Sequence, residues 1–96
     1  MTEKIDEAFY ERADAHIHLS NQQLKHMERG RVSASMMYGL ARFNAWVTAT
    51  DCKNTSDLAA ARQSTIDYFV AQYKMMLEEN LDDYIHNFNK YMGVAE

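Results

Sequence analysis

The sequence predicts an all-α protein, and three observations support this fold class. The chain contains no proline, the residue that breaks helices most strongly. No run of useful length alternates apolar and polar residues with the period of two that marks a β-strand. From Ser56 to Met92 there is neither proline nor glycine, and apolar residues recur at helical spacing. We therefore expect three long helices, or four if the third helix breaks, in an up-down-up bundle that forms one domain over residues 1–96.

The first helix is expected to begin near Thr2, whose hydroxyl can cap it, with acidic residues in the first turn. At about 100° per residue, its apolar residues share one face, and His16 lies among them. We expect the helix to end around Glu28–Arg29, because Gly30 can adopt the left-handed conformation that stops a helix.

The second helix is expected to begin at Ser33, a good N-cap residue. Two neighbouring stripes run along it. The main face is Met36, Met37, Leu40, Phe43, Asn44 and Val47, and the second stripe is Gly39, Phe43, Trp46 and Thr50. A glycine inside a helix costs about 1 kcal/mol relative to alanine. A close approach of another helix at Gly39 would offset that cost.

The third helix can be capped by Asn54, Thr55 or Ser56, and its apolar stripe continues to the end of the segment. The stripe consists of Ile66, Phe69, Val70, Tyr73, Met76, Leu77, Leu81, Tyr84, Phe88 and Tyr91. One helix over this segment would be roughly 54 Å long, whereas a compact chain of this size is about 30–35 Å across. The helix would extend past its neighbours unless it breaks near Asn80, which could cap a separate fourth helix.

The amino-acid composition and charge argue against several functional classes of protein. The formal net charge of −4 does not favour broad nucleic-acid binding, which needs a basic face. No apolar run approaches the roughly 20 residues of a membrane span, and the first residues lack the apolar core of a signal peptide. Cys52 is the single cysteine, so no disulfide can form within the chain. We expect a cytoplasmic protein.

No residue pattern predicts a catalytic, cofactor or metal site. His16 and His18 lie about 200° apart on a helix, so they cannot share one ion, and Asp14 with His18 makes an incomplete set of ligands. Asp83 and His86 have the spacing of di-iron bundles, but a second copy of that motif is absent from the sequence. The small basic patch of Lys25, His26, Arg29 and Arg31 is accounted for by complementing a helix end and by solvation.

Aromatic and methionine side chains are abundant, and such residues are enriched at interfaces. Most of them should be ordinary core residues. The apolar residues after Asn80 are better explained as an interface, because the first two helices are too short to cover them. The predicted dimer interface is Gly39, Phe43, Trp46, Leu81, Tyr84, Ile85, Phe88 and Tyr91.

Several stretches resemble domain-of-unknown-function family 3144. They are Phe9-Tyr10-Glu11-Arg12-Ala13-Asp14 with Ile17, Leu19 and Asn21; Val32-Ser33 to Ala41-Arg42-Phe43-Asn44-Ala45; Tyr68-Phe69 with Gln72-Tyr73; and Met76-Leu77 to Asn80-Leu81-Asp82-Asp83-Tyr84. The resemblance implies a small bacterial, all-helical protein and supplies no catalytic residues. It singles out the polar residues Arg12, Asp14, Asn21, Arg42, Asn44, Asn80 and Asp83. A buried network that fixes helix register is the favoured interpretation, and a binding pocket is the alternative.

The sequence therefore favours a non-enzymatic homodimeric interaction or scaffold module with no cofactor. Its expected partner is a second copy of the chain, and the sequence identifies neither another protein partner nor a membrane. Two alternatives remain open: a helical bundle that binds a small ligand or a metal, and a nucleic-acid accessory protein.

Overall fold

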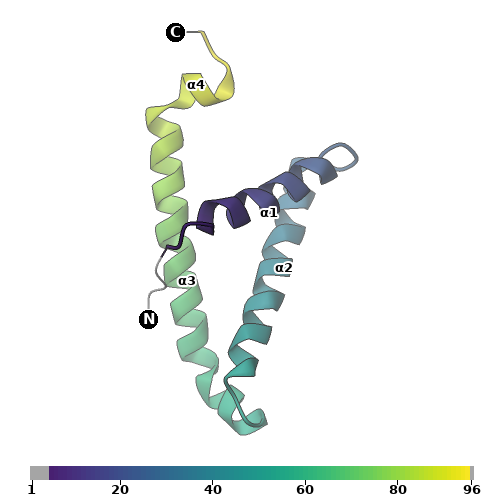
Figure 1. The fold of residues 1–96 in the computed structure, drawn as a ribbon, viewed down its shortest axis with the longest axis vertical. Coiled ribbons are helices and arrows are strands. Elements are labelled where there is room, and N and C mark those ends of the chain that lie inside the picture. The colour runs from purple at the N-terminus through teal and green to yellow at the C-terminus, as the bar shows by residue number, and fades with distance from the viewer. Residues whose placement is uncertain (1–4, 96) are drawn as a thin grey trace. The chain divides into compact units, whose positions relative to one another are not determined.

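The computed structural model describes residues 5–95, and every regular element in that range is an α-helix. The helices are α1 (Phe9–Gln23), α2 (Arg29–Thr50), α3 (Thr55–His86) and α4 (Phe88–Met92), labelled along the chain in Figure 1. The prediction of an all-α fold with three long helices is confirmed. A fourth helix is present, but it is short.

Contacts between Cα atoms group the chain into two units, Met1–Val47 and Thr48–Glu96. The boundary falls inside the continuous helix α2 rather than in a loop. The up-down-up order of the helices and the single domain over residues 1–96 therefore stay predictions.

The first turn of α1 is fixed by Asp6. Its Oδ1 accepts a hydrogen bond from the Ala8 amide at 3.0 Å, and its two carboxylate oxygens accept from the Arg12 guanidinium at 3.1 and 2.8 Å. These charge-assisted bonds from Arg12 lower the pKa of the Asp6 carboxyl, and the same bonds raise the pKa of Arg12. Thr2 lies outside the described residues, but residues 5–8 are not helical and α1 begins at Phe9. The expectation of a helix that runs on from near Thr2 is therefore wrong, because the Asp6 side chain caps the chain just before Phe9.

The end of α1 differs from the prediction. The helix ends at Gln23, and the expected continuation to Glu28–Arg29 is wrong. The Lys25 amide donates to the carbonyl of Gln22 at 3.3 Å, and the His26 amide donates to Gln23 at 3.1 Å. These bonds span three residues rather than four, so the last turn tightens and the helix stops without a glycine.

The start of α2 also differs from the prediction. Gly30 is the second residue of α2 and has no positive φ, so it is not the stop of the preceding helix. Ser33 lies inside α2 rather than at its N-cap. The carbonyl of Glu28 accepts a hydrogen bond from the Val32 amide at 3.1 Å. This bond closes the first helical turn before Ser33, and the Glu28 carboxylate is favourably placed at the positive end of the helix.

The start of α3 confirms the capping prediction and selects Asn54 among Asn54, Thr55 and Ser56. Asn54 has extended backbone angles (φ −159°, ψ 176°), and its Oδ1 accepts from the Asp57 amide at 2.9 Å. The Asp57 carboxylate in turn accepts from the Lys53 amide at 3.1 Å. The two side chains satisfy backbone donors reciprocally, as in a capping box.

Helix α3 continues through Asn80, as one uninterrupted ribbon in Figure 1. The Asn80 side-chain amide donates to the carbonyl of Met76, one turn earlier, at 2.8 Å. The alternative of a break near Asn80 is therefore wrong. With 32 residues, α3 is about 48 Å long.

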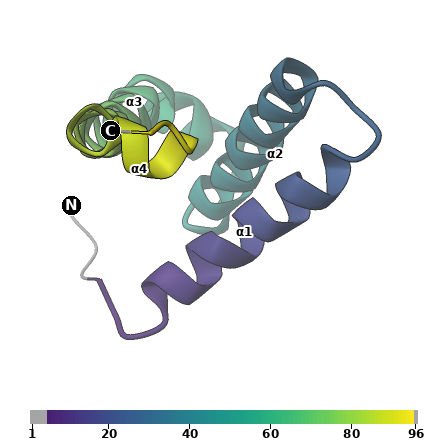
Figure 2. The same ribbon diagram turned by 90° about the horizontal axis from the view of Figure 1, so that it is seen from above.

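The chain turns sharply at Asn87 instead. Its amide group donates to both the carbonyl and the carboxylate of Asp83 at 3.0 Å, and α4 then runs across the axis of α3 (Figure 2). The Tyr91 hydroxyl donates to the two Asp83 carboxylate oxygens at 3.3 and 3.1 Å, and the rings of Tyr84 and Tyr91 lie 4.9 Å apart. Gly93, with φ of 70°, ends α4 in the left-handed conformation.

Asp83 also changes the acidity of Tyr91. The hydrogen bond to the Asp83 carboxylate raises the pKa of the Tyr91 phenol above its usual value, because ionisation would remove the donor. Because the pKa of Tyr91 is raised, its hydrogen bond to Asp83 stabilises the folded α3–α4 corner at pH values below the usual tyrosine pKa. That stabilisation is lost as pH rises through the raised value.

Removing the cap of α3 should destabilise the protein. We expect Asn54→Ala to lower the free energy of unfolding by about 1 kcal/mol, because the Asp57 amide loses its acceptor. Urea unfolding followed by circular dichroism at a fixed protein concentration measures the change. Asn54→Asp keeps an acceptor and serves as the control. Equal midpoints for the alanine variant and the wild type would contradict this role.

Removing the acceptor at the α3–α4 corner should make Tyr91 more acidic. We expect Asp83→Ala to lower the pKa of Tyr91 toward its ordinary value, since both the hydrogen bond and the nearby negative charge disappear. The ¹³Cζ chemical shift of Tyr91, followed by NMR from pH 8 to 12, reports this pKa. Asp82→Ala removes a neighbouring carboxylate and should leave the Tyr91 titration unchanged.

Candidate interaction surface

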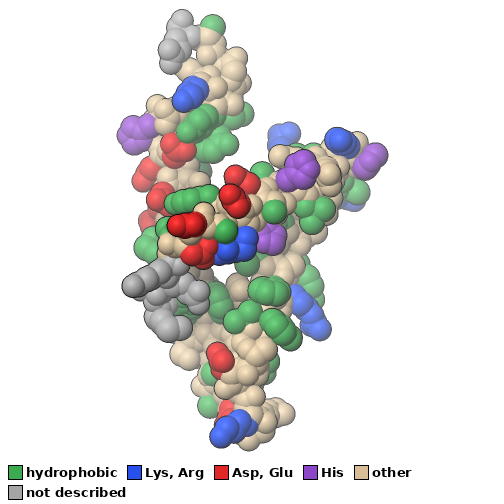
Figure 3. Space-filling model, viewed as in Figure 1, with side chains coloured by type: hydrophobic (Ala, Val, Ile, Leu, Met, Phe, Trp, Pro, Cys, Tyr) green, Lys and Arg blue, Asp and Glu red, His purple; other side chains and the backbone are tan. Residues whose placement is uncertain are grey.

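Apolar side chains lie at the surface of every helix. Val32, 5% exposed, is the one residue of the described range that is buried within the chain. Large apolar side chains usually fill the core of a domain of this size. Figure 3 shows hydrophobic side chains spread over the visible surface of the helices. The chain therefore presents on its surface the residues that would ordinarily form a core.

The predicted stripe of α2 is part of this surface. Phe43 and Trp46 are 60% and 61% exposed, and their rings lie 5.6 Å apart. A Cβ added at Gly39 would meet no atom within 4 Å. Within the unit Met1–Val47 no helix approaches Gly39 closely, so the expected close approach stays a prediction.

The predicted interface residues of α3 and α4 are exposed as well. They are Leu81, Tyr84, Ile85, Phe88 and Tyr91, with exposed fractions between 43% and 71%. On α3, the stripe residues before them are also partly or largely exposed, including Val70 at 61%. These side chains are exposed within their own unit, and the interface that they were predicted to form stays a prediction.

The predicted polar residues do not come together within the described units. Arg12 pairs with Asp6 rather than with another member of the predicted set. Asp83 binds Asn87 and Tyr91 at the α3–α4 corner. Of the full set, Asn44 is half-buried, and Arg12, Asp14, Asn21, Arg42, Asn80 and Asp83 are exposed. A buried network or a binding pocket made by these residues stays a prediction.

The histidines that resembled ligands have other neighbours. His18 lies 3.3 Å from the Gln22 amide nitrogen, and the His86 ring lies 2.7 Å from the carbonyl of Asp82. His16, expected on a buried apolar face, is exposed. Within residues 5–95, no group of three His, Cys, Asp or Glu side chains is arranged to hold a metal ion.

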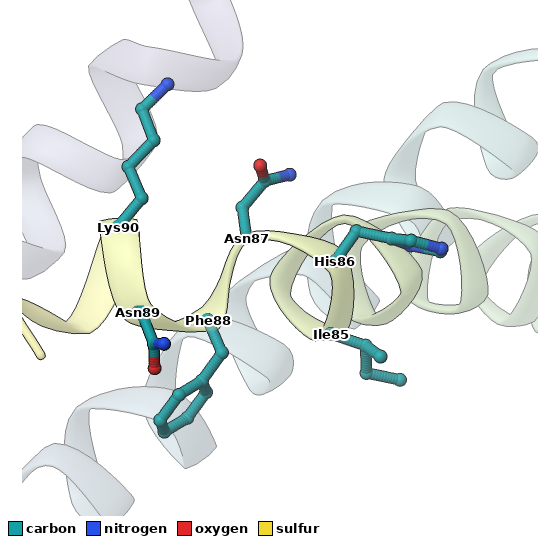
Figure 4. Close-up of a pocket in the computed structure, with 6 residues that line it drawn as sticks. All are labelled: Ile85, His86, Asn87, Phe88, Asn89 and Lys90. Carbon is teal, nitrogen blue, oxygen red and sulfur yellow. The ribbon is translucent and has the colours of Figure 1, made fainter. Parts of the chain in front are cut away.

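A shallow hollow lies at the α3–α4 corner, and its lining comes from one continuous segment, Ile85–Lys90. Figure 4 shows that these side chains diverge: Asn87 and Lys90 point to one side, and Phe88 and Asn89 point to the other. Because the side chains do not converge on a common point, the hollow lacks the geometry of a ligand pocket. The ring of Phe88 forms an apolar edge of this hollow.

Three residues have clear structural roles that were not predicted from the sequence. Asp6 fixes the start of α1, Val32 is buried, and Asn87 ends α3. A signal existed for Asn87, because Asn87 and Asn89 are poor helix formers close to the final glycine. Val32 carries no local signal that distinguishes it from the other apolar residues of α2.

The described helices include none with the length and hydropathy needed to cross a bilayer.

A comparison with curated protein sequences found no match. Among solved structures, the NMR structure of the protein NB7890A from Shewanella sp is similar to this chain. Their sequences are 40% identical, the TM-score is 0.77, and the likeness covers 98% of this chain and 100% of that one. A family model described as "Protein of unknown function (DUF3144)" matches residues 9–85, which confirms the resemblance seen in the sequence. This match covers most of the chain, so the protein belongs to domain-of-unknown-function family 3144.

Proposed function

We propose that the protein is a non-enzymatic interaction or scaffold module that works as a homodimer in the bacterial cytoplasm. The observation that carries the proposal is the exposure of its apolar side chains, with Val32 alone buried among the described residues. Exposed apolar surface of this extent marks an interaction site, because water-exposed hydrocarbon is unfavourable.

The lengths of the helices favour a second chain as the partner that packs on the C-terminal part of α3. Helix α2 has 22 residues and α3 has 32, so α3 is about 15 Å longer. The link between them, residues 51–54, is short, so any pairing of the two within one chain must begin near Thr55. Wherever the two units lie, α2 cannot reach past about Leu77. Helix α2 therefore leaves the apolar residues of α3 and α4 beyond Leu77 uncovered.

The proposal predicts a dimer that one substitution can weaken. Sedimentation equilibrium at micromolar concentration should give about twice the chain mass of 11.2 kDa. Phe88→Asp should shift the protein toward monomer, because a carboxylate at this 54% exposed apolar position resists burial in an interface.

Lys90→Gln is the matched control for this experiment. It changes the net charge by the same amount as Phe88→Asp, but Lys90 points to the opposite side of α4 (Figure 4). The control should keep the dimer mass. A monomeric wild type would overturn the proposed function, whereas a dimer unaffected by Phe88→Asp would place the interface elsewhere on the chain.

A further inference from the structure

Asn80 interrupts the apolar stripe of α3 on the stripe's own face. It follows Tyr73 by seven residues and Ile66 by fourteen. Seven residues turn a helix by about 700°, which is 20° short of two full turns, so the three side chains form one row. Asn80 is therefore in the position of an apolar contact residue.

The residues around Asn80 confirm that it lies within the stripe. Met76 and Leu77 precede it by about one turn, and Tyr84 follows by one turn. These three side chains are 42–49% exposed, so no other part of the unit Thr48–Glu96 covers this face. Any partner that covers this face must also cover Asn80.

The hydrogen bonding of Asn80 is incomplete for a covered position. Its amide nitrogen donates to the carbonyl of Met76 at 2.8 Å. Within residues 5–95, no donor is bonded to its carbonyl oxygen Oδ1, which water can reach in the single chain. Once the stripe is covered, water is removed, and Oδ1 needs a donor from the partner because a buried unpaired carbonyl is unfavourable.

We propose that the α3 stripe packs against α3 of a second copy, and that Asn80 fixes the register of the pair by hydrogen bonding to Asn80 of the partner subunit. This inference rests on the proposed homodimer and specifies its interface. A two-fold axis brings identical surfaces together, and an asparagine carries both a donor and an acceptor, so two copies satisfy each other. A single buried asparagine on an apolar helix face selects one register and one oligomeric state.

Replacing Asn80 with leucine tests the role in register. Native mass spectrometry should show one dimer for the wild type. For Asn80→Leu it should show a mixture that contains species larger than the dimer, because the continuous apolar row no longer excludes other alignments. The matched control is His86→Leu, which adds the same side chain on α3 about 120° away from Asn80. This control should stay a single dimer.

Replacing Asn80 with aspartate tests whether the position is covered at all. Asn80→Asp has nearly the same shape, but it places two carboxylates opposite each other and removes the donor. At pH 7 the dissociation constant of the dimer should rise at least about tenfold, whereas His86→Asp should leave it within about twofold. Circular dichroism at high protein concentration checks that both variants remain helical.

The outcomes separate this inference from the proposed function. A wild-type dimer that is equally homogeneous in Asn80→Leu and equally tight in Asn80→Asp would overturn the role of Asn80 and leave the dimer standing. A wild-type monomer would overturn both.

Discussion

Burial of apolar surface is the constraint on which this structure depends. The helices are well formed by local hydrogen bonds, yet the described part of the chain buries only Val32. Isolated helices gain most of their stability in proteins from packing of an apolar face rather than from intrinsic propensity. Under the proposed homodimer, folding and association of the chain would be coupled. Its stability would depend on protein concentration.

The sequence predicted those parts of the fold that local chemistry decides. The all-α class, three long helices and the cap at Asn54 are confirmed, because proline content, helical periodicity and side-chain capping act within a few residues. The ends of α1 and the start of α2 were misplaced, although Gly30 and Ser33 are favoured at such positions. Propensity is a weak prior there, and backbone hydrogen bonds from Glu28 onward extended the helix across both residues.

The candidate surface was partly predictable for a different reason. The periodicity of Leu81, Tyr84 and Phe88 indicated an apolar face, but periodicity is the same for a core and for an interface. Helix length was the property that favoured an interface over a core, since shorter neighbouring helices cannot cover the whole face. The ion pair between Arg12 and Asp6 was not predicted from the sequence, because the two residues are six positions apart and Asp6 lies before α1 begins.

The two ends of α3 connect local chemistry to the proposed interface. Asn54 and Asp57 fix where the helix begins, and the bonds from Asn87 and Tyr91 to Asp83 fix where it ends. These contacts set the length of α3, and its length beyond α2 sets how much apolar surface remains for a partner. Asn80 then lies inside the remaining surface rather than at a helix end, even though asparagine is common at caps. A polar residue held in the middle of an apolar row is better explained by the alignment of two helices than by the stability of one.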